Sequence, residues 1–397
     1  MNLLVITYWK YEDALIQTYT LPYLRIIRSI LPAESTIYLV TLETEGASTV
    51  LREAEPGIKR FSFELHPFGI KAMLGWRKNI RFLASFAKEN KIQSIHTWCT
   101  PAGAIGYLVS KRTGIPLVLD SYEPHAEPMV ETGTWKKGGL AHRLLFRLEI
   151  KQSLHAKWRI GVVDKMRDYA RDKYGVSRDN FLVKPACIDF QLFRFHDNAT
   201  IIRTQLGIAA DDVVCVCAGK FGGLYLEERA FQVFKDMTQA FNAKLRFILL
   251  TSTPRKNIEA YCASVHLDPA LVHSLFVPHN KVPEYMNAAD FAFSHFKSVE
   301  SRRYCTPIKN GEYWAMGLPV VILKNISDDS DIITANNAGV VMQGIGKEDG
   351  TAAGHAIKRL LDGENREELK KRIRALAQKH RNFTIAEAVY RKIYGTL

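Results

Sequence analysis

Short apolar segments of strand length alternate with helical patterns from one end of the chain to the other, which restricts the folds open to it. In the first half, strands are expected at residues 3–7, 36–41, 94–96, 116–120, 160–163 and 181–183. In the second half, they are expected at residues 213–218, 245–251, 274–277, 291–294, 319–323 and 339–342. The helical patterns between them include residues 14–31, 79–88, 102–113 and 225–241. This alternation predicts an α/β protein with doubly wound parallel sheets.

The alternation forms two sets, which predict two Rossmann-like domains. We expect the first at residues 1–190 and the second at residues 191–383, joined near residues 185–196. A chain of 397 residues has room for two such cores. Ligands of these sheets bind at the carboxyl ends of the strands, so a site is expected in a cleft between the domains.

The composition, with 47% apolar and 24% charged residues, is typical of a soluble globular protein. No apolar run approaches the roughly 18 residues of a membrane-spanning helix. The N-terminus has no basic start and no small-residue cleavage site, so we interpret it as a first strand and not a signal peptide. The six cysteines lack metal-ligand or redox spacing, and Cys215 and Cys217 alternate within an apolar segment. We therefore expect buried thiols, no metal site and a cytoplasmic location.

The net charge of +13 suggests an anionic partner. Basic residues alternate with aromatic ones in residues 70–91, and a second basic stretch covers residues 135–159. This pattern is typical of a helix that makes peripheral contact with an anionic membrane. It is equally typical of an ordinary surface helix whose long cationic side chains cover apolar surface. Nucleic acid is not expected, because no nucleic-acid-binding motif accompanies the charge.

Residues 306–321 combine a helix start, a short helix and a buried strand. Thr306 suits the N-cap and Pro307 the first helical position, while Gly317 and Pro319 end the helix. Lys309 lies near the positive end of this helix, which is unfavourable unless an anion binds there. Glu312 follows one turn later on the same side, where a carboxylate can accept the hydroxyls of a ribose. For an isolated pair, two solvated charges on an amphipathic helix would be the better interpretation, but the surrounding pattern favours a ligand site.

Two further groups of residues suit ligand contacts. Gly219, Lys220 and Gly222 lie in a turn after an expected strand, where the backbone can approach a phosphate; a tight connection is the alternative. Residues 120–127 follow the strand at 116–120 and hold His125 among acids. His125 is expected to bond a sugar hydroxyl, with Glu123 or Glu127 orienting it or the acceptor; the alternative is acids that favour a helix start. For His96, a role in the site and a structural role are equally expected.

The motifs of the second half resemble those of GT-B glycosyltransferases, in particular glycosyltransferase family 4. The resemblance is carried by residues 306–321, by residues 277–285 with 289–290, and by residues 183–189 with Phe193. Two departures occur. Leu226 stands where the family has a second lysine, and Tyr304 stands where it has the first of two glutamates. Arg302 or Arg303 is a candidate helper to Lys309 for the missing cation, and Glu300 for the missing acid.

The resemblance implies roles for individual residues, which we state as expectations. The donor-binding residues are Gly219, Lys220, Gly222, Pro278, His279, Thr306, Ile308, Lys309 and Glu312; the catalytic residues are His125, Lys220, Lys309 and Glu300; the acceptor-binding residues are Tyr8, Trp9, Tyr122 and Glu127. For the loop with Tyr8 and Trp9, a packed surface loop is an equal alternative. The final helix, within residues 384–397, is expected to pack back on the first domain.

The implied activity is transfer of a hexose-type sugar from a nucleoside diphosphate to a glycan or lipid-linked glycan. Uridine is the favoured base. Retention of anomeric configuration is expected, without metal or any other cofactor. A nucleotide-sugar-binding protein without catalysis and a UDP-sugar 2-epimerase of the same fold are the alternatives. Peripheral contact with the inner face of the membrane through residues 70–91 would suit a lipid-linked acceptor.

Overall fold

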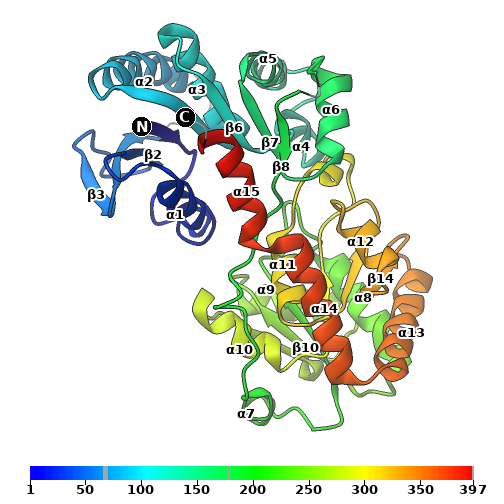
Figure 1. Cartoon of the computed structure of the whole chain (residues 1–397). Helices are drawn as coiled ribbons and strands as arrows, with labels where there is room; N and C mark the ends of the chain where they lie inside the picture. The colour runs from blue at the N-terminus through cyan, green and yellow to red at the C-terminus, as the bar shows by residue number, and fades with distance from the viewer. Residues whose placement is uncertain (66–69, 178, 396–397) are drawn as a thin grey trace. The chain divides into compact units, whose positions relative to one another are not determined.

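The computed structural model describes residues 1–65, 70–177 and 179–395. The chain divides into two compact units, Met1–Pro185 with Thr384–Leu397 and Ala186–Phe383 (Figure 1). The first boundary therefore lies at residue 185, where residue 190 was expected. The chain passes from one unit to the other twice, and we describe each unit by itself.

The first unit is built on an eight-stranded sheet in the order β3-β4-β2-β1-β5-β6-β7-β8. The strands are β1 (Asn2–Ile6), β2 (Ile37–Glu43), β3 (Arg52–Glu55), β4 (Ile58–Glu64), β5 (Ile92–Trp98), β6 (Leu117–Tyr122), β7 (Trp158–Gly161) and β8 (Phe181–Val183). All neighbours pair in parallel except β3 and β4. Those two strands were not expected from the sequence, because β3 is an edge strand without an apolar residue longer than alanine and β4 mixes apolar with basic residues.

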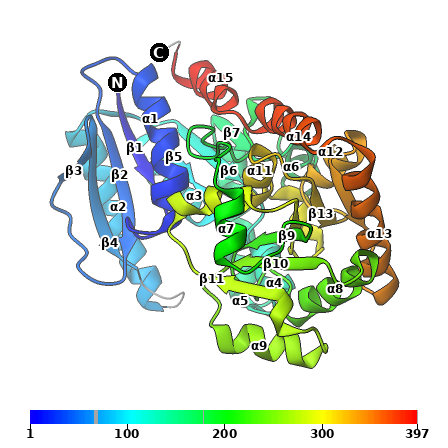
Figure 2. The same ribbon diagram turned by 90° about the horizontal axis from the view of Figure 1, so that it is seen from below.

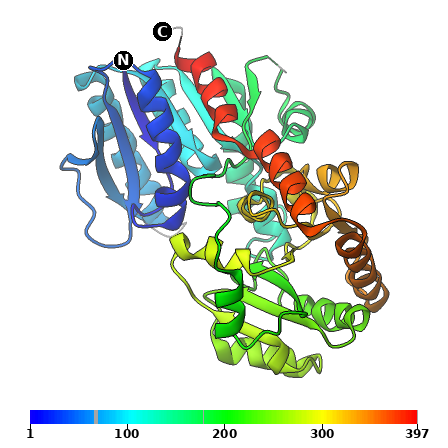
Figure 3. The same ribbon diagram turned by 60° about the horizontal axis from the view of Figure 1, so that its bottom comes forward.

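The helices of the first unit cover both faces of this sheet. They are α1 (Leu21–Ile30), which continues a π-helical turn at Ile16–Thr20, α2 (Ile70–Glu89), α3 (Cys99–Thr113), α4 (Ala126–Glu131), α5 (Leu140–His155), α6 (Lys165–Tyr174) and α15 (Phe383–Tyr394). Figure 3 shows α1 and α15 side by side on one face, where the rings of Tyr23 and Tyr390 meet edge to face. Helix α3 packs closely on the sheet, because a Cβ atom on Gly106 would lie 2.3 Å from Thr97 Cγ2.

A buried charged cluster joins α15 to the middle of this sheet. Asp120 accepts a 2.7 Å hydrogen bond from Tyr390, and its carboxylate lies 3.1 Å from His96 Nε2 and 3.2 Å from Lys184 Nζ. Tyr394 completes the cluster, 2.7 Å from His96 Nδ1. Burial alone would raise the pKa of Asp120, but Lys184, His96 and Tyr390 together hold it at about 2. His96 therefore has a structural role.

The second unit contains a six-stranded parallel sheet in the order β11-β10-β9-β12-β13-β14. The strands are β9 (Val213–Ala218), β10 (Leu245–Leu250), β11 (Val272–Leu275), β12 (Phe291–Ser294), β13 (Val320–Leu323) and β14 (Gly339–Met342). The chain builds outward from β9 on one side and outward from β12 on the other. The strand order thus reverses between β9 and β12, which is the position where doubly wound sheets bind ligands.

Eight α-helices of the second unit lie among its described residues: α7 (Ala199–Gln205), α8 (Glu228–Thr238), α9 (Arg255–Ser264), α10 (Val282–Asn287), α11 (Ile308–Ala315), α12 (Asp329–Ala335), α13 (Lys347–Gly363) and α14 (Arg366–Arg381). Figure 2 shows α8 and α13 next to each other. Their backbones approach closely, since a Cβ atom on Gly354 would lie 2.8 Å from the Met237 carbonyl oxygen. The helix expected at 225–241 begins only at Glu228, because the preceding residues form a turn.

All six cysteines are buried, as expected for thiols in a packed core. In the part of the chain that the structure describes, no helix is both long enough and apolar enough to cross a membrane.

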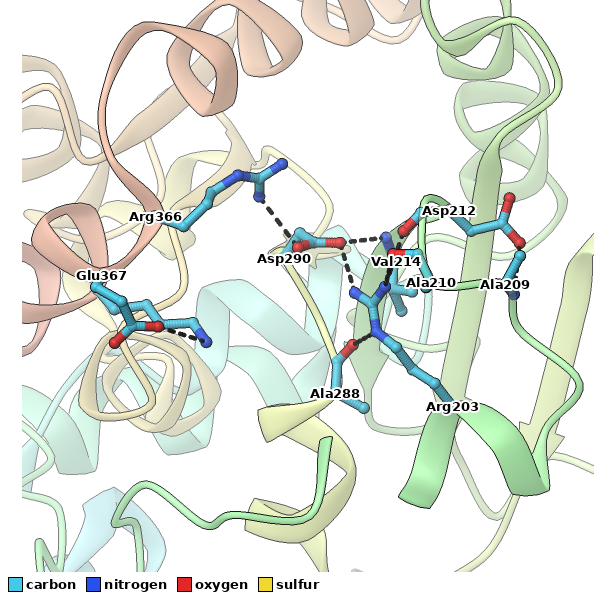
Figure 4. Close-up of polar contacts among 10 residues, drawn as sticks. Arg203, Ala209, Ala210, Asp212, Val214, Ala288, Asp290, Arg366 and Glu367 are labelled. Atoms are coloured by element: carbon cyan, nitrogen blue, oxygen red, sulfur yellow. Dashed lines mark hydrogen bonds and ion pairs between the residues drawn. The ribbon is translucent and has the colours of Figure 1, made fainter. Parts of the chain in front are cut away.

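The sheet of the second unit is held at its amino edge by the carboxylate of Asp290, which precedes β12. One oxygen accepts hydrogen bonds from the backbone N–H of Val214 at 2.7 Å and from Arg203 at 2.9 Å. The other oxygen accepts from Arg366 at 3.1 Å (Figure 4). One acid thus connects β9, β12, α7 and α14.

We predict that Asp290→Asn destabilises the protein by about 2 kcal/mol, because the amide cannot accept all three hydrogen bonds and two of the donors are charged. Urea unfolding measures the difference. Asp211→Asn, which removes a surface pair with Lys244, should have little effect. Equal changes in the two variants would contradict the role of Asp290.

Candidate functional site

The segments that contain the expected donor-binding residues lie at the carboxyl edge of the second sheet. They follow β9 (the glycine-rich turn), β11 (residues 276–279) and β12 (residues 295–304), and parallel strands bring these ends to one side. Helix α11 joins the same edge, because the hydroxyl of Tyr313 accepts a 2.7 Å hydrogen bond from the N–H of Ala218 at the end of β9.

The glycine-rich turn after β9 requires its glycines. Gly219 and Gly222 have φ values of +129° and +102°, which other residues rarely adopt. A Cβ atom on Gly222 would also lie 2.8 Å from Glu227 Oε1. The side chain of Lys220 is exposed at the tip of the turn. The turn therefore presents backbone and one cation to any ligand at this edge.

His295, which the sequence analysis did not single out, supports the glycine-rich turn from β12. Its Nε2 donates to the carbonyl of Lys220 at 2.9 Å, and its Nδ1 lies 3.1 Å from Cys217 Sγ. Its ring stacks on that of Tyr225. Burial lowers the pKa of His295 to about 4, so the ring is neutral at pH 7 and adds no positive charge to the site.

We predict that His295 makes the protein more stable as the pH rises from about 4 to about 6.5. In this window an unfolded histidine, with a pKa near 6.5, binds more protons than the folded one, so stability increases with pH. His295→Gln should reduce the gain in unfolding free energy across this pH window by at most roughly 3 kcal/mol. Urea unfolding at several pH values provides the measurement, with the exposed His355→Gln as control. An unchanged slope in His295→Gln would refute the assignment.

The start of α11 differs from the expectation. The helix begins at Ile308, Pro307 occupies the N-cap position, and no side chain caps it. Thr306 was expected to be the N-cap, but its hydroxyl accepts hydrogen bonds from the N–H of Ala186 at 3.2 Å and from Arg381 at 2.9 Å. These long-range partners, which no local rule contains, replace the capping bond.

Glu312 is buried, with 2% of its surface exposed, so the interpretation of two solvated charges is wrong for this residue. Lys309 Nζ donates to one carboxylate oxygen at 2.8 Å, and His279 Nε2 lies 3.5 Å from the other. Burial alone would raise the pKa of Glu312, but Lys309 and His279 lower it overall, so the carboxylate is ionised at neutral pH. The structure therefore brings three of the expected donor residues together.

The other expected donor residues lie nearby in the chain. Pro278 is exposed and begins the 3₁₀ turn His279–Lys281, and Ile308 is half-buried at the start of α11. Glu300 is exposed in the 3₁₀ helix Glu300–Tyr304, with its carboxylate 3.5 Å from Arg303.

A cavity of 660 Å³ lies in the second unit beside the glycine-rich turn. It is lined by residues of the α8 start, of the segment after β12 and of the ends of β13 and β14, including Leu226, Glu227, Lys297, Ser298, Lys324 and Gln343. Its lining mixes charged, polar and apolar groups, which suits a polyhydroxylated ligand.

In the first unit, His125 is half-buried and precedes α4. Its backbone N–H and that of Ala126 donate to Glu149 at 2.9 and 2.8 Å. Burial raises the pKa of Glu149 to about 7, although these hydrogen bonds oppose the change. This buried acid, which the sequence analysis missed, fixes the backbone at His125.

The four expected acceptor residues have different surroundings. Tyr122 is buried and its hydroxyl donates to Ser153 at 2.5 Å, while Glu127 accepts a hydrogen bond from Tyr169. Tyr8 and Trp9 are half-buried at the end of β1, where the Trp9 carbonyl accepts from the N–H of Leu42 at 3.1 Å. Tyr122 thus belongs to the core of the unit.

Solved structures match the chain over its whole length. Sucrose-phosphate synthase from Thermosynechococcus elongatus is 15% identical with a TM-score of 0.75. WaaG, a glycosyltransferase involved in lipopolysaccharide biosynthesis, is 15% identical with a TM-score of 0.72. Anabaena HepE, in complex with UDP and glucose, is 14% identical with a TM-score of 0.71. Each match covers 100% of both chains.

The chain has the GT-B fold. No protein-family model and no curated protein matches the sequence. At these identities the likeness establishes the GT-B architecture of two Rossmann-like sheets, whereas the chemistry depends on the individual residues of the site.

The residues of this GT-B chain offer charge neutralisation and hydroxyl recognition. Among the described residues, no group of three or more histidine, cysteine, aspartate and glutamate side chains is arranged to hold a metal ion. The cations at the ligand edge include Lys220 and Lys309, and a buried acceptor there is Glu312. Such a set suits a ligand that carries both phosphates and hydroxyl groups.

Proposed function

We propose that the protein is a glycosyltransferase that moves a hexose-type sugar from a nucleoside diphosphate to a glycan or lipid-linked glycan. Uridine is the favoured base, in keeping with the UDP and glucose bound to HepE, a protein of the same fold. The observation that carries the proposal is the buried carboxylate of Glu312 between Lys309 and His279, beside the reversal of strand order.

In this proposal, Glu312 accepts the hydroxyls of the donor ribose. Lys220, Lys309 and the N-terminus of α11 bind the diphosphate, whose charge increases as the sugar leaves. Pro278, His279, Thr306 and Ile308 shape the nucleotide site, and Gly219 and Gly222 allow close approach of the backbone. The cavity beside the glycine-rich turn gives space for the sugar.

The reaction proposed is transfer with retention and without a metal. The acceptor hydroxyl attacks the anomeric carbon on the face from which the diphosphate departs. The bond from carbon to the phosphate oxygen breaks, the new glycosidic bond forms, and the departing phosphate takes the proton of the acceptor. Because the departing phosphate accepts that proton, no enzymic base is needed. Lys220 and Lys309 neutralise the charge of the leaving group.

His125 and Glu300 are proposed to contact hydroxyls of the donor sugar. Tyr8 and Trp9 are proposed to contact the acceptor. Tyr122 is buried and Glu127 is bound to Tyr169, so we assign these two residues the role of shaping that region.

A nucleotide-sugar-binding protein without catalysis is the second candidate. It is favoured by Tyr304 at the position of an acid in the family that the sequence resembles. This candidate predicts donor binding without turnover when acceptors are supplied.

Cytoplasmic location and peripheral membrane contact remain part of the proposal. Arg77, Lys78 and Arg81 are exposed on α2, whereas Leu83 and Phe86 on the same helix are buried. The exposed cations suit anionic lipid. The side chains of residues 66–74, at the start of this basic stretch, lie outside those described.

We predict that one nucleoside diphosphate stabilises the protein against heat, and that EDTA leaves this effect unchanged. UDP, GDP, ADP and their common sugar conjugates form the panel. Ligand at about 100 times its dissociation constant should add roughly 2.7 kcal/mol. Release of the nucleoside diphosphate from its sugar conjugate on addition of a glycan acceptor then separates the two candidates. Stabilisation by none of the panel would contradict the proposed donor site.

We predict that Lys309→Ala weakens binding of the nucleoside diphosphate by about tenfold or more and weakens binding of the nucleoside far less, because a charge-assisted contact to phosphate is lost. Isothermal titration with both ligands measures the difference. Lys371→Ala, which removes an exposed cation on α14, is the control. Equal losses for nucleoside and diphosphate would remove Lys309 from the phosphate site.

A further inference from the structure

We propose that Arg302 binds the diphosphate of the donor and supplies the second cation that the glycine-rich turn lacks. The inference rests on the proposed function and adds a specific residue to it. Arg302 belongs to the 3₁₀ helix Glu300–Tyr304, which follows β12 at the carboxyl edge of the second sheet.

The guanidinium of Arg302 is buried without a counter-charge. Arg302 is 7% exposed, and its Nε has no hydrogen-bond partner among the described residues. One guanidinium nitrogen donates to Ser301 Oγ at 3.3 Å, and no described carboxylate lies within ion-pair distance. Burying a charge in this way is costly unless an anion pairs with it. An anionic ligand would supply the missing counter-charge.

The segment that leads from β12 to Arg302 pairs with the residues just after the glycine-rich turn. The N–H of Leu226 donates to the His295 carbonyl at 2.7 Å, and the N–H of Lys297 donates to the Leu224 carbonyl at 3.0 Å. Burial raises the pKa of Tyr225, which stacks on His295, and the nearby charge of Arg302 opposes that rise. Arg302 is thus close to the turn that is proposed to bind phosphate.

Three other basic residues near the turn are engaged by other groups or are uncharged. Arg303 lies 3.5 Å from Glu300 and donates to Asn325 at 3.1 Å. Lys297 donates to the carbonyl of Gly223 at 2.9 Å. His295 is neutral, as its lowered pKa of about 4 requires.

Leu226, at the position where the resemblance led us to expect a second lysine, is buried in the core of the second unit. A cation cannot be placed there without disturbing that core. Arg302 follows β12, whereas the glycine-rich turn follows β9 across the strand reversal. Its planar fork of N–H donors matches phosphate oxygens better than a lysine does.

The test compares Arg302→Met with Arg303→Met. Isothermal titration measures binding of UDP and uridine, or of another nucleoside diphosphate and its nucleoside if the stabilisation panel selects a different base. We expect Arg302→Met to weaken binding of the diphosphate by about tenfold or more, while the affinity for the nucleoside stays within about twofold of the wild type. Arg303→Met should retain the affinity for both ligands.

A second readout is the melting temperature without ligand. Replacing an unpaired buried charge by an apolar residue of similar size is often neutral or stabilising, so Arg302→Met should melt at the wild-type temperature or above it. The increase in melting temperature that the diphosphate produces in the wild type should be largely lost in Arg302→Met. If this variant fails to fold, Arg302→Gln carries the same comparison with a polar side chain.

The outcomes separate this inference from the proposed function. Full diphosphate affinity in Arg302→Met, while the wild type binds, overturns the inference alone. Equal losses for diphosphate and nucleoside, or a loss in Arg303→Met as large as in Arg302→Met, also overturn it. Failure of the wild type to bind any nucleoside diphosphate overturns both.

Discussion

The reversal of strand order between β9 and β12 determines where chemistry can occur in the second unit. Helices leave the two strands toward opposite sides, so the connections separate and leave the strand ends accessible. Every element of the candidate donor site is attached to this edge. The hydrogen bond from the Ala218 N–H to Tyr313 places α11 there, and the contact between His295 and the Lys220 carbonyl fixes the glycine-rich turn.

Two buried acids show how their surroundings separate structure from function. Asp120 is surrounded by His96, Lys184 and Tyr390, all of them buried, so this cluster is complete without a ligand. Glu312 is also buried, but its partners Lys309 and His279 keep about a third of their side chains exposed. The first acid stabilises a core, whereas the second can exchange part of its contacts for a ligand.

The strands that are buried on both faces, such as β9 and β12, could be predicted from the sequence, because their apolar runs differ from the patterns of the amphipathic helices around them. The sequence was not sufficient for β3 and β4, whose pattern is polar. In the site, the spacing of Lys309 and Glu312 predicted a local pair. The roles of His295 and Thr306 depend on partners 70 residues away or more, which no local pattern contains.

The position of α15 has a consequence for synthesis on the ribosome. The first unit is made first, since it begins with β1, yet its buried cluster includes Tyr390 and Tyr394. Until these residues have been made, the buried cluster of Asp120, His96 and Lys184 lacks two of its members, and the ring of Tyr23 lacks part of its cover. The unit whose residues emerge earliest is therefore completed last, after the whole second unit has left the ribosome.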